Sequence, residues 1–156
     1  LQNAIAEIAG SARQIVDLFA GCGTLSLPLL DNITNLLAVE QSEDALAALK
    51  FGVDAAGIGG RVKTASRNLF DAPLMPDELE GFDMAILDPP RSGAAAQCQM
   101  LAQSGIATIA MVSCNPASFA RDAAILTESG FQLEWVQVID QFSFSNHLEM
   151  IGAFGR

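Results

Sequence analysis

The chain has 156 residues, of which 51% are hydrophobic and 17% are charged, and its formal net charge is −10. This length suits one domain with a substantial core, and this composition excludes an intrinsically disordered segment. Nucleic-acid backbones are bound mainly by Lys and Arg, so the negative charge argues against RNA or DNA binding by this domain alone. Either nucleic acid is not the partner, or the basic surface belongs to another part of the protein.

The cysteines and the apolar runs indicate the cellular setting. Cys22, Cys98 and Cys114 are odd in number and form no Cys-x-x-Cys pair, which indicates neither a disulfide framework nor a zinc site and favours a reducing, cytoplasmic location. The apolar runs are shorter than the roughly 18 residues of a membrane span, and no signal peptide is evident. Because the chain begins at Leu1 inside a helix-like segment, we expect residues 1–156 to be one domain of a longer protein.

A glycine turn organises the first half of the chain. We expect a helix over residues 1–8, a strand over 14–19, the turn at 20–24, a helix over 25–30, a strand over 36–39 and an amphipathic helix over 44–55. Strand, glycine turn and helix open a Rossmann-like unit, whose glycines let the backbone approach a ligand at the helix N-terminus. Gly21 and Gly23 are present, but Ser26 replaces the third glycine of the dinucleotide pattern, so the turn by itself is a weak signal.

Glu40 ends the second strand, about 20 residues after the turn, where a carboxylate that accepts hydrogen bonds from a ribose is expected. The alternative is a solvated acid ahead of the next helix. There Ser42 could cap the helix, and Glu43 and Asp44 suit its positive end.

The second half continues the alternation. We expect strands over 61–66, 82–87 and 106–112, helices over 94–103 and 117–129, and final strands over 131–139 and 147–154. Strands that alternate with helices predict an α/β fold with a doubly wound, mostly parallel seven-stranded sheet. The last two strands have no helix between them, which predicts an antiparallel hairpin at one edge.

Three of these strands lead into candidate functional residues. Asn68 and Asp71 lie in the polar turn after the third strand, where they could contact an adenine or act as ordinary turn residues. Asp88 precedes Pro89, Pro90 and Arg91, so a rigid loop holds it at the end of the fourth strand. Cys114 follows the fifth strand and precedes Asn115-Pro116. Ligands bind at such strand ends in parallel sheets, although a free cysteine is more often a small core residue.

Several segments together resemble the catalytic domain of RNA 5-methyluridine (uracil-C5) methyltransferases, which use S-adenosylmethionine and include tRNA and 23S rRNA enzymes. The matching segments are Val16 to Thr24, Val39-Glu40, Asn68, Leu87 to Gly93, Val112 to Pro116, Asp140 to Phe142, and His147 to Glu149. The glycine turn is shared by many methyltransferases. Asp-Pro-Pro-Arg, Ser-Cys-Asn-Pro and the terminal His-x-Glu are much narrower when they occur together.

The resemblance implies a role for each matching residue. Cys114 falls on the nucleophile, which adds to uracil C6 so that C5 can attack the methyl group, and Glu149 falls on the base that removes the C5 proton. The cofactor positions are Phe19, Gly21, Gly23, Thr24, Glu40, Asn68 and Asp88. The family usually has Asn at the position of Thr24, and some members have Thr there. An acidic pocket that includes Asp17 would also suit the cationic sulfur of S-adenosylmethionine.

The resemblance also implies parts that these residues do not include. Family members bind RNA through an N-terminal β-barrel and an intervening domain, and some hold an iron–sulphur cluster on upstream cysteines. We therefore expect RNA to be the substrate, bound mainly elsewhere in the protein, with no metal and no membrane contact in this segment. Weak or no activity is expected of residues 1–156 alone.

Alternatives remain for single residues and for the whole chain. Phe142 and Phe144 could stack on a flipped-out base or belong to the core, His147 could orient Glu149, and Arg91 could contact substrate or satisfy loop carbonyls. Another class I methyltransferase acting on a base nitrogen, a NAD-binding domain and a non-catalytic S-adenosylmethionine-binding module are the competing functions. Arg91 and Cys114 count against the first, Ser26 against the second, and the pair Cys114 and Glu149 against the third.

Overall fold

The structure, a computed structural model, describes residues 1–139 and 149–156. Its strands are β1 (Gln14–Leu18), β2 (Asn35–Glu40), β3 (Val62–Ser66), β4 (Met84–Leu87), β5 (Thr108–Ser113), β6 (Gln132–Ile139) and β7 (Glu149–Gly155). Its α-helices are α1 (Gln2–Ala9), α2 (Glu43–Ala55), α3 (Ala95–Gln103) and α4 (Pro116–Glu128).

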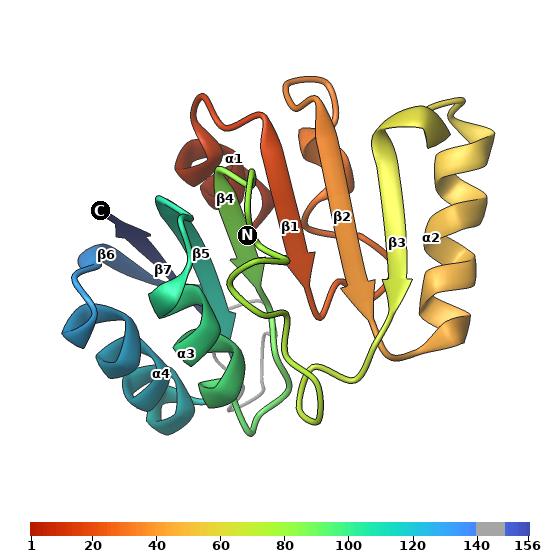
Figure 1. The fold of residues 1–156 in the computed structure, drawn as a ribbon. Coiled ribbons are helices and arrows are strands. Elements are labelled where there is room, and N and C mark those ends of the chain that lie inside the picture. Colours follow the sequence, from red (N-terminus) through yellow and green to blue (C-terminus); the bar gives the residue numbers. More distant parts are fainter. Residues whose placement is uncertain (140–148) are drawn as a thin grey trace.

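The strands form one seven-stranded sheet in the order β3-β2-β1-β4-β5-β7-β6 (Figure 1). Strands β1 to β5 pair in parallel. Strand β7 lies between β5 and β6 and runs antiparallel to both. The predicted fold class is therefore confirmed, including the antiparallel edge.

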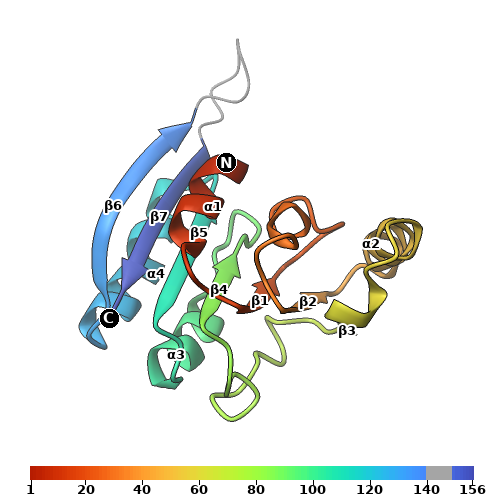
Figure 2. The ribbon, with the colours of Figure 1, turned by 90° about the horizontal axis from the view of Figure 1, so that it is seen from above.

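Helices cover both faces of the sheet, with α1 and α2 on one side and α3 and α4 on the other (Figure 2). Successive side chains of a strand point to opposite faces. On β5, Ala110 and Val112 accordingly pack with the α1 side of the core, whereas Ile109 and Met111 pack with the α3 and α4 side. A central parallel strand is buried on both faces, which explains the uninterrupted apolar runs in the sequence.

The predicted helix over residues 25–30 is wrong. Only a 3-10 turn, Leu27–Leu29, follows the glycine turn. Pro28 has no N–H to donate, and the N–H groups of Leu29 and Leu30 donate to carbonyls only three residues back, those of Ser26 and Leu27. No α-helix N-terminus therefore faces the site here, in contrast to the Rossmann-like pattern. The other expected elements agree with the structure within two residues at each described end.

Candidate active site

The glycine turn between β1 and β2 adopts a backbone that few residues tolerate. Phe19, Gly21 and Gly23 have φ values of 63°, 55° and 83°, and Phe19 is the only non-glycine residue with positive φ in the described part of the chain. A Cβ on Gly23 would lie 2.8 Å from Cγ of Leu27, so close packing also demands glycine there. The turn brings the Phe19 ring to 5.3 Å, centroid to centroid, from the ring of Phe70.

Glu40 ties this turn to the start of α2. Its Oε2 accepts a hydrogen bond from the Gly21 N–H at 3.0 Å, and its Oε1 accepts from the N–H groups of Gln41 and Ser42 at 2.8 Å. Ser42 in turn caps α2, because its hydroxyl accepts from the Ala45 N–H. Three backbone N–H groups therefore hold the Glu40 carboxylate in place. One of them belongs to Ser42, which is also the N-cap of α2.

Asp17 is a buried acid with no partner. Its side chain is 1% exposed, and neither its carboxylate oxygens nor the Ser26 hydroxyl has a hydrogen-bond partner among the described residues. Burial raises the pKa of Asp17 to about 7, the negative charges of Asp88 and Glu40 add to this shift, and Ser26 opposes it. Asp17 lines neither cavity, and the Ser26 hydroxyl is the uncharged polar group close enough to affect its titration, so burial keeps this carboxyl mainly protonated below about pH 7.

Asp88 lies where two cavities meet. A cavity of about 450 Å³ is lined by Leu1, Gln2, Thr24, Leu25, Asp88, Val112 and Glu149. A second, of about 360 Å³, is lined by Phe19, Glu40, Gln41, Arg67, Leu69, Phe70, Asp88, Pro89 and Pro90. Asp88 keeps solvent access, but crowding by protein atoms and the charge of Glu149 raise its pKa to about 6.

Cys114 and Glu149 come together through the pairing of β5 with β7. Ser113 pairs with Met150, so the register continued by one residue places Cys114 opposite Glu149. Cys114 is half-buried, whereas Cys22 is exposed and Cys98 is buried. Strand pairing therefore brings the backbone of Cys114, one residue beyond β5, to the start of β7, where Glu149 lines the larger cavity, although Cys114 itself lines neither cavity.

The other predicted residues take up different positions. Thr24 lines the larger cavity, and its carbonyl accepts from Gln2 Nε2 at 2.9 Å. Asn68 is engaged within its own turn, where it donates to Asp71 and accepts from the Phe70 N–H. Phe70 and Gln2 line the cavities without having been expected there. The sequence feature that could have identified Phe70 as a site residue is its position shortly after β3, at the edge of the sheet where the site lies.

Some expectations lie outside the described residues, namely those for Asp140, Phe142, Phe144 and His147. Within residues 1–139 and 149–156, no helix has the length and apolar character needed to cross a bilayer. The same residues include no group of three or more His, Cys, Asp or Glu side chains that could hold a metal ion.

Relatives of this chain are RNA methyltransferases by name. It is 39% identical over 156 residues to an uncharacterized RNA methyltransferase of Caulobacter vibrioides, covering 100% of this chain and 37% of that protein. It is 37% identical over 154 residues to a 23S rRNA (uracil(1939)-C(5))-methyltransferase of Burkholderia thailandensis, covering 92% of this chain and 33% of that protein. The chain thus spans about a third of the length of these relatives.

Solved structures share the fold at low sequence identity. A Pyrococcus abyssi tRNA (uracil-54, C5)-methyltransferase in complex with S-adenosyl-L-homocysteine superimposes with a TM-score of 0.81 at 23% identity, over 97% of this chain and 37% of that one. The [4+2]-cyclase SpnF superimposes with a TM-score of 0.76 at 10% identity, over 99% of this chain and 80% of that one, so the fold by itself does not specify the reaction. A sequence model of the family described as tRNA (uracil-5-)-methyltransferase matches residues 74–154, and the chain belongs to that family.

Proposed function

We propose that the protein containing this chain transfers a methyl group from S-adenosylmethionine to C5 of a uridine in RNA, through a covalent adduct between Cys114 and C6. The observation that supports this proposal is the register of β5 and β7, which brings Cys114, one residue beyond β5, toward Glu149 at the start of β7. Glu149 lines a cavity together with Asp88 and Thr24. Family membership supports the reaction class.

The described residues fit a cationic nucleoside cofactor. S-adenosylmethionine carries its methyl group on a positively charged sulfur. Asp88 lines both cavities and would stabilise a cation there. The buried Asp17, which interacts electrostatically with Asp88, would add to this effect without lining either cavity. Phe19 and Phe70 offer apolar faces in the smaller cavity for an adenine. A carboxylate has about four acceptor sites, and Glu40 uses three of them on backbone N–H groups, so a ribose hydroxyl would join an acceptor already held in place.

Uracil C5 is a poor nucleophile, which explains the need for a thiol and a base. The Cys114 thiolate would add to C6 and shift electron density to C5 and O4, and C5 would then take the methyl group. Glu149 would accept the proton that remains on C5, and the electrons of that C–H bond would expel the thiolate and restore the 5,6 double bond. Arg91 is exposed beside this site, and its position suits contact with the substrate.

RNA affinity would come mainly from other parts of the protein. The chain has a net charge of −10, and it spans only 37% of the Caulobacter relative. Robust RNA methylation by residues 1–156 alone would contradict this assignment.

All three cysteines are free thiols, which supports a reducing compartment such as the cytoplasm.

A trapping experiment tests the covalent route. The full-length protein is incubated with S-adenosylmethionine and RNA containing 5-fluorouridine, whose C5 substituent cannot leave as a proton. A protein–RNA band on a denaturing gel, mapped by mass spectrometry to Cys114, is expected. Cys114→Ala should abolish the band. The control Cys98→Ala should keep it, because Cys98 is buried in the core and burial raises the pKa of its thiol. An adduct that survives Cys114→Ala would refute the proposal.

A further inference from the structure

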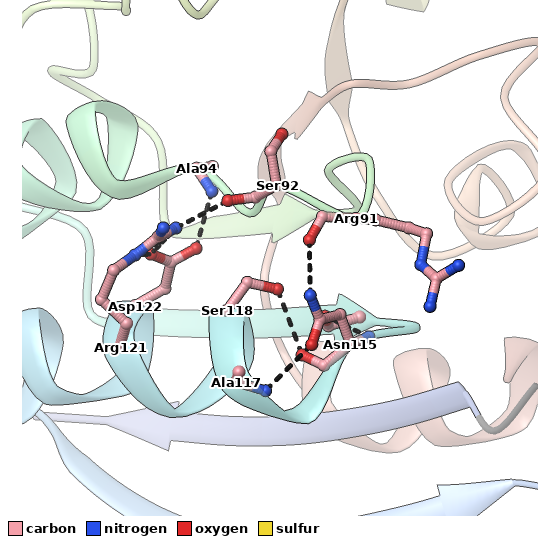
Figure 3. A network of polar contacts seen from close by, with 9 residues as sticks. Arg91, Ser92, Ala94, Asn115, Ala117, Ser118, Arg121 and Asp122 are labelled. Carbon is pink, nitrogen blue, oxygen red and sulfur yellow. Dashed lines mark hydrogen bonds and ion pairs between the residues drawn. The ribbon is translucent and has the colours of Figure 1, made fainter.

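Arg121 and Asp122, on α4, hold the loop that follows β4 although they lie outside the lining of both cavities (Figure 3). Asp122 is 1% exposed, which is unusual for a carboxylate unless its oxygens are paired. Its Oδ2 accepts a hydrogen bond from the Ala94 N–H at 2.6 Å. Its Oδ1 accepts from Nε and Nη2 of Arg121 at 2.8 and 2.6 Å.

The guanidinium of Arg121 completes the attachment. Its Nη2 also donates to the carbonyl oxygen of Ser92 at 2.9 Å, so the pair holds a carbonyl and an N–H on the same short segment. Such charge-assisted hydrogen bonds are shorter and stronger than neutral ones. Removal of Asp122 would leave the Ala94 N–H without this acceptor and Arg121 without its counter-ion.

A second attachment joins the same loop to the residue that follows Cys114. Asn115 Nδ2 donates to the carbonyl oxygen of Arg91 at 2.9 Å, and Asn115 Oδ1 accepts from the Ala117 N–H at 3.0 Å as the N-cap of α4. The loop that begins at Asp88 is therefore attached to α4 at its N-cap and again about two turns further on, at Asp122.

Gly93 shows how closely the loop approaches the helix. Its φ is +74°, and a Cβ there would collide with Arg121 Nη2 and Asp122 Oδ2 and lie 2.9 Å from Cβ of Ser118. The polar pair thus meets the backbone where only glycine fits. A surface ion pair would not need such an approach.

We propose that Asp122, with Arg121, is a positioning residue that holds the loop of residues 88–94, through Ser92 and Ala94, in register with Cys114 during methyl transfer. This inference rests on the proposed function, because the geometry that it preserves is that of the thiol relative to the loop. Neither residue touches the reacting atoms. Loss of the pair would let the loop move relative to Cys114, and small displacements of catalytic groups lower the rate strongly.

A purely structural role is the competing explanation. Ala94 is the N-cap of α3 and has no side-chain acceptor, so the Asp122 carboxylate also acts as a remote cap for that helix. A cap alone would affect unfolding and leave the kinetics of the folded enzyme unchanged. The test therefore needs a kinetic readout and a local structural one besides stability.

The full-length protein is compared with Asp122→Asn, Arg121→Lys and the control Glu128→Gln, which removes an exposed carboxylate from the same helix. Arg121 is half exposed, so Arg121→Lys should fold even if Asp122→Asn does not. We expect kcat to fall about tenfold or more in Asp122→Asn and severalfold in Arg121→Lys, with KM for S-adenosylmethionine within about threefold. Amide hydrogen exchange over residues 91–94 should speed up at least about tenfold.

The outcomes separate this inference from the proposed function. Unchanged exchange over residues 91–94 in both variants would show that the pair does not hold the loop. Faster exchange with kcat equal to that of Glu128→Gln would assign the pair a capping role only. If the unaltered protein methylates no uridine C5, the proposed function fails and the kinetic role of the pair fails with it. The exchange data would still decide whether the pair holds the loop.

Discussion

The parallel strands place their carboxyl ends at the site, whereas the antiparallel edge strand β7 places its amino end there. Glu40, Asp88 and Cys114 lie at the carboxyl ends of parallel strands or just after them, whereas Glu149 is the first residue of β7. Because β7 runs antiparallel to β5, its amino end reaches the edge at which β5 ends. A carboxylate from the end of the chain can therefore stand beside a thiol that follows the fifth strand.

The two regions also differ in what keeps their side chains in place. Glu40, on the parallel side, is held by three backbone N–H groups and stays oriented even if its strand shifts slightly. Glu149 depends on strand register, since a one-residue slip of β7 would turn its side chain to the other face. Substitutions on the parallel side, where the cofactor would bind, should therefore lower the affinity for the cofactor. Substitutions at the antiparallel edge should lower the catalytic rate.

Glu149→Gln gives the largest expected effect and tests the edge directly. The amide cannot accept the C5 proton, so turnover should fall about 10²- to 10⁴-fold while an adduct with ordinary uridine accumulates. Methyl transfer in reactions quenched at successive times measures turnover, and denaturing gels measure the accumulated adduct. Turnover equal to that of the unaltered protein would remove Glu149 from the mechanism.

Asp17→Asn tests the buried acid on the parallel side. Burial raises the pKa of Asp17 in the folded protein to about 7, well above that of an exposed aspartate, so between about pH 4 and 7 the folded state holds a proton that the unfolded state has lost. Stability therefore falls as pH rises through this window, and above it the cost amounts to as much as about 4 kcal/mol. Asp17→Asn should be more stable than the unaltered protein at pH 8 in urea unfolding and no different near pH 3.

The same variant should weaken cofactor binding. A cation favours the carboxylate form, so affinity for S-adenosylmethionine in the unaltered protein should rise from pH 5.5 to 8, and binding should release a proton. Asp17→Asn should lower affinity several-fold at pH 8 and reduce this pH dependence in calorimetry, leaving the part contributed by Asp88, whose pKa is about 6. Asp77→Asn, at an exposed acid, is the control. A pH dependence preserved in Asp17→Asn would assign it to another group.

Gly152→Ala tests how β7 is seated. A Cβ on Gly152 would lie 2.7 Å from Cζ of Phe119 and 3.2 Å from Cε2 of Phe154, so β7 or α4 must shift. Overpacking of this kind costs about 1–3 kcal/mol in stability, and turnover should fall more than cofactor affinity. Gly52→Ala, inside α2 with nothing within 4 Å of its Cβ, should instead stabilise the protein by up to about 1 kcal/mol. Equal urea midpoints for the two variants would contradict this packing argument.

Glu40→Gln should have the smallest effect. One acceptor oxygen remains, but the amide N–H₂ group would face at least one backbone N–H, so stability should fall by about 1 kcal/mol. Affinity for S-adenosylmethionine should drop several-fold with kcat nearly unchanged. Glu43→Gln, on the exposed first turn of α2, is the comparison. A larger loss of kcat than of affinity would mean that Glu40 does more than bind.

Local patterns predicted most of the architecture. Apolar runs bounded by glycine, proline and polar residues located the strands, and the Ser42 cap located the start of α2. The failure at residues 25–30 also has a local cause, because Pro28 limits the hydrogen bonding to a 3-10 turn. The strand ends placed Glu40, Asp88 and Cys114 at one edge, since parallel strands share their direction.

The strand ends predicted from the sequence do not determine which side chains become neighbours, and the tertiary structure decided this. The insertion of β7 between β5 and β6 brings Glu149, the first residue of β7, to the edge where Cys114 follows β5, and it depends on hydrogen bonds between strands far apart in the chain. The burial of Asp122 against Ala94 likewise depends on how α3 packs on α4. The sequence by itself determined which chemical groups reach this edge of the sheet. Their partners were decided by strand register and helix packing, because neither is encoded in any single local pattern.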